Sequence, residues 1–175
     1  MNITSHTLEP KIYVACLAAY NNGILHGQWI DANQSEGDLS KAVAEILAKS
    51  PIEEVAEEWA IHDYEDFGEI QIGEYESLKS ISELAEFVIE HGELGAMVYE
   101  YYEHLEDAIE KLEDNYYGAY EDKAEFARTF TEETQEIPDN LAFYIDYEKM
   151  ARDFEYSGDI NCFYLNGEYH IFLAS

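Results

Sequence analysis

Toward its C-terminal end the sequence reads Ile160-Asn161-Cys162-Phe163-Tyr164-Leu165-Asn166-Gly167-Glu168-Tyr169-His170-Ile171-Phe172-Leu173. Two runs rich in β-branched and aromatic residues flank Asn166-Gly167, and an Asn-Gly pair in that setting predicts a tight β-hairpin. Upstream, a helix is expected over residues 119–132, and another helical stretch between Pro138 and about Phe154. The first of these helices places four residues on one face: Tyr120, Ala124, Ala127 and Phe130. These signals predict a C-terminal α+β domain over residues 115–175.

The N-terminal residues predict a second small α+β domain, over residues 1–76. A strand over residues 12–17 and a returning strand over residues 24–30 flank Asn21-Asn22-Gly23, which offers a turn with a positive φ. The next helix is expected to have Asp38 as its N-cap and to end at Ser50-Pro51. Its apolar positions recur at helical spacing: Leu39, Val43, Ile46 and Leu47. A third strand is expected over residues 59–64.

The middle of the chain, residues 77–114, predicts a helical domain. Ser80-Ile81-Ser82-Glu83 fits a capping box, and Gly92 is a natural helix stop. A longer helix from Leu94 to Leu112 is expected to follow, with carboxylates recurring every three or four residues between Glu100 and Asp114. At a rise of roughly 1.5 Å per residue, this spacing lines them along about 21 Å of helix. The expected fold is therefore α+β, an elongated chain of three small domains with an acidic helical middle.

Charge is the most unusual property of the chain. Its 175 residues include 39 Asp and Glu against 9 Lys and Arg, a formal net charge of −30. Residues 51–115 alone hold 21 acidic and two basic side chains. Hydrophobic residues make up 47% and aromatic residues 14%, which supplies a core and distinguishes the chain from a disordered acidic tail. The excess charge therefore belongs to a folded surface and reports on partners.

The composition excludes several classes of partner and location. Direct binding of nucleic acid needs Lys and Arg to displace counterions, so nucleic acid is not an expected partner. An anionic bilayer would repel the chain, and no apolar run approaches the roughly 20 residues of a membrane span. The first residues, Met1-Asn2-Ile3-Thr4-Ser5-His6, lack the basic start and apolar core of a secretory signal, so a cytoplasmic location is expected.

Motifs for catalysis and cofactor binding are absent from the sequence. There is no G-x-S-x-G, P-loop or G-x-G-x-x-G, and no Cys/His spacing typical of zinc. His26 and His62 lie in predicted strands, where packed or hydrogen-bonded histidines are more common than ligands. We therefore expect a protein that is not an enzyme and uses no cofactor or metal. A hydrolase that depends on a carboxylate pair remains a weaker alternative.

The acidic residues of the middle domain suggest what the charge does. An ordinary solvated helix face intersperses Lys with Glu, because each i,i+4 pair stabilises a helix by about 0.2–0.5 kcal/mol. The stretch from Glu83 to Asp114 has one lysine, so it forgoes that stabilisation, which suggests that the field itself is functional. Duplex DNA carries one charge per about 1.7 Å, so the net charge matches roughly 50 Å of duplex and a dimer roughly 100 Å. Carboxylates could therefore substitute for phosphates in a basic DNA-binding channel.

The best candidate phosphate surrogates are the acids of the predicted middle domain, and six more acids extend the track toward the first domain. The middle set is Glu83, Glu86, Glu90, Glu93, Glu100, Glu103, Glu106, Asp107, Glu110, Glu113 and Asp114. The extension is Glu53, Glu54, Glu57, Glu58, Asp66 and Glu69.

Four stretches, taken in order, resemble the ArdA antirestriction family of mobile genetic elements. They are Tyr20-Asn21-Asn22-Gly23 with Gly27-Gln28-Trp29-Ile30-Asp31; Ala60-Ile61-His62-Asp63-Tyr64-Glu65 with Phe67; Ala124-Glu125-Phe126-Ala127 before Pro138; and Tyr144-Ile145-Asp146-Tyr147-Glu148 with Ala151-Arg152-Asp153. The resemblance implies three small domains in a curved, elongated protein that forms a homodimer through its C-terminal domain. It also implies mimicry of bent DNA and inhibition of type I restriction-modification enzymes at their methyltransferase core. In such a family His62 to Glu65 would be mainly structural, with Asp63 and Glu65 as additional surface candidates.

The interpretation that these observations favour is a DNA mimic that blocks restriction, with inhibition of modification left open. The alternative is an acidic decoy or chaperone for another basic DNA-binding protein.

Overall fold

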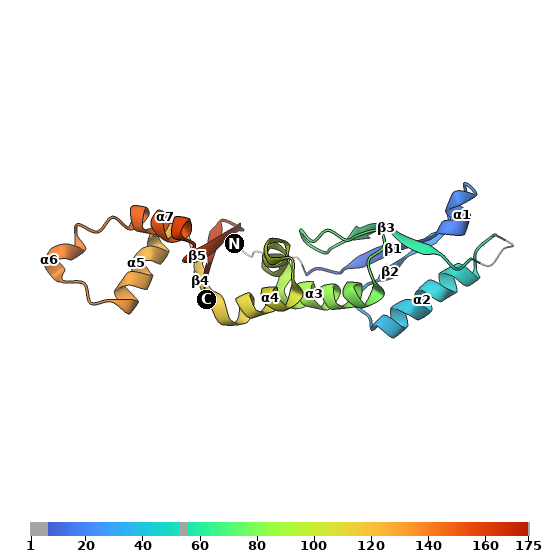
Figure 1. The fold of residues 1–175 in the computed structure, drawn as a ribbon, viewed down its shortest axis with the longest axis horizontal. Coiled ribbons are helices and arrows are strands. Elements are labelled where there is room, and N and C mark those ends of the chain that lie inside the picture. Colours follow the sequence, from blue (N-terminus) through green and yellow to red (C-terminus); the bar gives the residue numbers. More distant parts are fainter. Residues whose placement is uncertain (1–6, 53–55, 175) are drawn as a thin grey trace. The chain divides into compact units, whose positions relative to one another are not determined.

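The computed structural model describes residues 7–52 and 56–174 (Figure 1). The chain is 49% helical and 21% strand and contains two small antiparallel sheets, which confirms the mixed α+β class. Its contacts divide it into two compact units, Met1–Tyr101 and Tyr102–Ser175. Each unit holds one of the sheets, and the predicted division into three domains is not confirmed by this arrangement.

The first unit is built on the sheet β2-β1-β3. Strand β1 (Lys11–Cys16) lies between β2 (Gly27–Asp31) and β3 (Trp59–Glu65), antiparallel to both. The expected pairing of the first two strands is confirmed, as is the positive φ of 75° at Gly23. The connection differs from the prediction because helix α1 (Leu17–Asn21) forms directly after β1, and β2 begins only at Gly27.

The two helices predicted for this unit begin earlier in the structure than the sequence predicts. Helix α2 (Glu36–Ala48) is capped by Ser35, whose hydroxyl oxygen accepts a hydrogen bond from the Asp38 backbone N–H at 3.2 Å. Asp38 is therefore the partner of the cap rather than the N-cap itself. Helix α3 (Leu78–Tyr102) likewise begins after Ser77, whose Oγ accepts from the Ser80 backbone N–H at 3.1 Å. A serine three residues before the expected cap provides the acceptor in each case.

Helix α3 carries most of the predicted acidic face of this unit, and its inner side packs as expected. The residues of the predicted apolar stripe are all buried: Ile81, Leu84, Ala85 and Val88. Gly92 interrupts the helix with φ 64° and ψ −156°, which confirms it as a stop. Beyond it, Ala96 packs closely against Gly68, where an added Cβ would lie 2.6 Å from the Ala96 Cβ. The Ser82 hydroxyl donates to the Gln34 carbonyl at 2.6 Å, which holds the first half of α3 beside the loop before α2.

The second unit is built on the sheet β4-β6-β5. Strands β5 (Ile160–Leu165) and β6 (Glu168–Leu173) form the predicted hairpin, with positive φ values of 54° at Asn166 and 94° at Gly167. Strand β4 (Tyr116–Tyr120) pairs with β6, so helix α5 (Lys123–Thr134) begins four residues later than the prediction. Helices α6 (Asp139–Ala142) and α7 (Tyr147–Ser157) follow, and α7 ends at Gly158 in the left-handed conformation.

The expected continuous helix from Leu94 to Leu112 is wrong. Glu103 has φ 60° and His104 is extended, so α3 ends and a short helix α4 (Leu105–Glu110) begins. A π-helical turn, η1 (Lys111–Asn115), follows directly. A continuous helix would place Glu103 one turn from both Glu100 and Asp107, and such like-charge neighbours destabilise a helix. Carboxylates therefore do not line 21 Å of a single helix.

Candidate acidic interaction surface

The acidic side chains lie on the surface throughout the described residues. Within residues 7–52 and 56–174, every Asp and Glu is exposed except Asp66 and Glu76, which are half-buried. Burial of an unpaired carboxylate would cost several kcal/mol, whereas hydration of an exposed one costs nothing in folding. The negative charge of the described residues is therefore available to a partner.

In the first unit, exposed carboxylates alternate with buried apolar residues along α3. Glu83, Glu86 and Glu90 lie on the outer side of the segment whose inner side holds Leu84 and Val88. The Glu83 carboxylate forms an ion pair with Lys79 at 3.5 Å. Lys79 therefore offsets part of the Glu83 charge, and Lys11 pairs in the same way with Glu65, an additional candidate on β3, at 3.6 Å.

Two further candidates on α3 differ in how they are held. Glu93 directly follows the interruption at Gly92 and is exposed. The Glu100 carboxylate accepts a hydrogen bond from the Gln71 backbone N–H at 2.8 Å, which anchors the loop after β3 to the second half of α3. Glu100 therefore has a structural role in addition to its charge.

The candidates of the second unit lie on three kinds of backbone, and all are exposed. Glu103 precedes α4 in the left-handed conformation, and Glu106 and Asp107 occupy the first turn of α4. Acidic side chains in a first turn interact favourably with the helix dipole, so this pair also stabilises α4. The others lie at the end of α4 and in η1: Glu110, Glu113 and Asp114.

The structure describes four of the six acids that were predicted to extend the track toward the first domain. Glu57, Glu58 and Glu69 are exposed, and Asp66 is half-buried with φ 61°. Glu53 and Glu54 lie outside the described residues. Within the described residues no group of three or more His, Cys, Asp or Glu side chains could hold a metal ion.

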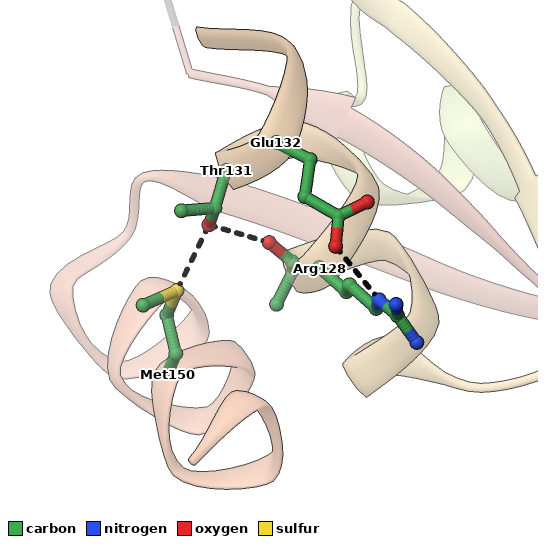
Figure 2. Close-up of polar contacts among 5 residues, drawn as sticks. Arg128, Thr131, Glu132 and Met150 are labelled. Carbon is green, nitrogen blue, oxygen red and sulfur yellow. Dashed lines mark hydrogen bonds and ion pairs between the residues drawn. The ribbon is translucent and has the colours of Figure 1, made fainter. Parts of the chain in front are cut away.

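Several of the basic side chains are paired locally and do not neutralise the candidate surface. In the second unit Arg128 Nε lies 2.9 Å from Glu132 Oε1 on α5 (Figure 2), and the hydrogen bond to this carboxylate raises the pKa of Arg128. Thr131 is buried beside this pair, where its hydroxyl donates to the Ala127 carbonyl at 2.6 Å. The Lys123 ammonium contacts Glu155 at 2.7 Å and so ties α5 to α7. Each of these cations is matched by an acid outside the candidate set.

One group of surface residues was only partly anticipated from the sequence. Asp63 and Glu65 lie two residues apart on the same face of β3, where they pair across the sheet with Tyr13 and Lys11 of β1. The Lys11 ammonium lies 3.6 Å from the Glu65 carboxylate. Glu74 lies in the following loop, where its backbone carbonyl accepts from the Ile61 backbone N–H at 2.9 Å. Nothing in the sequence near Glu74 signals this approach to β3, because the contact depends on how the loop folds back.

A protein-family model described as antirestriction protein (ArdA) matches residues 12–167, which include all four stretches of the resemblance noted above. No curated protein matches the chain. Among the described residues, no helix is long and apolar enough to cross a membrane.

Proposed function

The chain belongs to the ArdA antirestriction family, and from this premise we propose that it inhibits a type I restriction-modification enzyme by mimicking DNA. In this proposal the exposed carboxylates occupy the positions of DNA phosphates in the channel of the enzyme's methyltransferase core. The protein acts by binding, without turnover and without a cofactor. A cytoplasmic location belongs to the same proposal, because the target acts on intracellular DNA.

The observation that carries this proposal is the exposure of the acidic side chains. With a net charge of −30 and almost every described carboxylate open to solvent, the chain presents a strongly negative surface. Enzyme channels that bind DNA present Arg and Lys to phosphates, and carboxylates form charge-assisted hydrogen bonds with the same side chains. The family supplies the antirestriction role, and the surface supplies a chemistry by which it could work.

The distribution of the carboxylates suggests a graded effect of substitution. Exposed ion pairs contribute only about 0.2–1 kcal/mol each, so no single acid in the candidate set is expected to dominate. We expect single Glu→Gln changes to have little effect and combined changes to weaken inhibition step by step. Loss of all inhibition from one substitution would instead indicate a localised catalytic or binding site.

We also propose that the protein acts as a homodimer formed through its C-terminal residues. This part rests on the family resemblance. Two copies would double the length of duplex whose charge the protein can match. Light scattering coupled to size-exclusion chromatography measures the mass directly, and a monomer at the concentrations that inhibit the enzyme would contradict it.

A competition experiment tests the main proposal. A labelled duplex that carries the recognition site is bound to the methyltransferase core, and the full chain is titrated in while the bound duplex is followed by gel shift. We expect displacement that weakens strongly as salt rises, because exposed charge pairs are screened. If the chain binds a basic nucleoid protein but leaves the duplex on the methyltransferase, the decoy alternative replaces this proposal.

A further inference from the structure

A pocket of about 440 Å³ opens beside β3 in the first unit. Its lining includes two buried isoleucines, Ile61 and Ile72. Tyr20 from α1 and Tyr64 from β3 contribute aromatic sides, and the two carboxyl side chains in its lining are Asp63 and Glu74. Isoleucines, tyrosines and two acids in the lining of one pocket distinguish it from the acidic face of α3.

The walls of the pocket are held in place by specific contacts. The register of β1 with β3 shifts between Tyr13 and Val14, so that His62 is an extra residue on β3. The His62 ring meets the Tyr20 ring edge to face at 4.8 Å, and its Nε2 lies 4.0 Å from Glu74 Oε1. The His62 ring therefore supports the aromatic wall formed by Tyr20, and Glu74 lies near it.

The remaining polar groups are oriented in a similar way. The Tyr64 hydroxyl donates to Gln71 Oε1 at 3.0 Å, and the Tyr64 backbone N–H donates to Asp63 Oδ1 at 2.9 Å. Glu74 and Tyr20 nevertheless stay accessible, with 52% of the Glu74 side chain and 53% of Tyr20 exposed. The pocket is thus formed in advance, and its charged and aromatic groups face solvent.

We propose that this pocket receives an arginine side chain of the partner protein. Ile61 and Ile72 offer an apolar contact for the methylene stem of arginine, the tyrosine rings suit the face of a guanidinium, and the two carboxylates suit its N–H groups. Lysine fits less well, because its compact ammonium neither stacks on aromatic rings nor donates in a planar fork. The inference rests on the proposed function, since a protein that binds DNA phosphates presents arginines for this purpose.

The pocket gives the interaction a local anchor within a distributed field. Charge along α3 can attract any basic surface, and its strength falls as salt screens it. An arginine held between aromatic rings and carboxylates is partly shielded from water, and buried arginines and tyrosines are typical of binding hot spots. Orientation of the partner on the first unit would then come from this pocket.

Direct binding tests the pocket without any restriction enzyme. The full chain is titrated with N-acetyl-arginine amide and, separately, with N-acetyl-lysine amide, and the backbone amide resonances are followed by NMR. We expect a saturable shift of residues 61–64 and 72–74 with the arginine probe, and weaker binding of the lysine probe. Shifts of equal size at all acidic residues, or equal affinity for both probes, would overturn the proposal.

Variants then separate the pocket from general charge. The double variant Asp63→Asn/Glu74→Gln is expected to lower the affinity of the arginine probe at least about tenfold, equivalent to about 1.4 kcal/mol. The control Glu9→Gln/Glu45→Gln has the same net charge and exposed sites elsewhere in the first unit, and it should retain the affinity. Tyr20→Leu leaves the charge unchanged and is expected to reduce the preference for arginine over lysine. If the control loses as much affinity as the pocket variant, only general charge is at work.

Competition with the methyltransferase core distinguishes the two proposals. If the natural chain displaces DNA and the pocket variant competes no worse than the Glu9→Gln/Glu45→Gln control, the arginine pocket is overturned while DNA mimicry stands. If the natural chain fails to displace DNA but the arginine probe binds residues 61–64 as described, DNA mimicry is overturned and the pocket stands as a site for arginine on another basic protein.

Discussion

Neutralising Glu86 and Glu90 on α3 should weaken binding to the target and at the same time stabilise the protein. Both side chains are exposed, and neither lies within 4.0 Å of a cation among the described residues. In the double variant Glu86→Gln/Glu90→Gln, two exposed charges lost at about 0.2–1 kcal/mol each predict an affinity loss of roughly twofold to thirtyfold.

The opposite effect on stability follows from the spacing along the helix. Glu86 lies three residues after Glu83 and four before Glu90, so its charge opposes two neighbours on the same face. Like-charge pairs at these spacings cost about 0.2–0.5 kcal/mol each, so the variant should gain about 0.4–1 kcal/mol in unfolding free energy. Urea unfolding followed by circular dichroism measures this gain, and competition for the methyltransferase core measures the affinity.

The control Glu9→Gln/Glu45→Gln changes the net charge by the same amount. Glu45 lies one turn from both Lys41 and Lys49 on α2, so its neutralisation should leave stability unchanged or slightly lower. If the α3 variant is less stable than the natural chain, or loses no more affinity than the control, the reasoning that these acids are retained for their field is refuted.

Three further outcomes are expected. Replacement of Gly68 by Ala should destabilise the first unit by roughly 2 kcal/mol or more, because its φ is 63° and the new Cβ would lie 2.6 Å from the Ala96 Cβ; an unchanged urea midpoint would contradict this. The melting temperature should rise between about 0.01 and 0.15 M salt as the Debye length falls and self-repulsion is screened, and a flat or falling curve in calorimetry would count against that account. Burial raises the pKa of Cys162 from 9.0 to about 11, so alkylation by iodoacetamide at pH 8 should be about a hundredfold slower than in the unfolded chain. Because the folded-state pKa is the higher one, the associated stability is present below pH 9 and lost as the pH rises through about 11, which peptide mass spectrometry and pH-dependent unfolding can follow.

Local signals in the sequence predicted those parts of the fold that depend on neighbouring residues. Asn166-Gly167 defines its hairpin because both residues adopt the positive φ that the turn requires. The predicted cap positions lie three residues too late. The acceptors are Ser35 and Ser77, and each accepts a hydrogen bond from the backbone N–H three residues further along the chain. Strand β4 could also have been predicted from the sequence, since its three tyrosines favour a strand.

Other features depend on contacts that no local pattern records. Ala96 and Val98 of α3 are buried before the break at Glu103, and Ala108 of α4 is buried after it. The spacing of these apolar residues suits one continuous helix as well as two separate ones. The hydrogen bond from Gln71 to Glu100 joins residues 29 positions apart. The pocket beside β3 needs the extra residue His62 and the return of the loop at Glu74, so its components were visible as residue types but not as a site.

The density of charge explains why the acids are spread over so many elements. On the first segment of α3, Glu83 and Glu90 lie seven positions apart with Glu86 between them, a distance of about 10 Å at a rise of roughly 1.5 Å per residue. Neighbouring charges in this row are therefore about 5 Å apart along the axis, whereas duplex DNA carries one charge per about 1.7 Å. A single helix face therefore cannot match a duplex, because side chains on one face recur only every three or four residues, about 5 Å along the axis. Acids on strand β3, in the loops after it and in α4 raise the number of charges beyond that limit. Under the proposed mimicry, carboxylates on several kinds of backbone are what would let a folded chain approach the charge density of DNA.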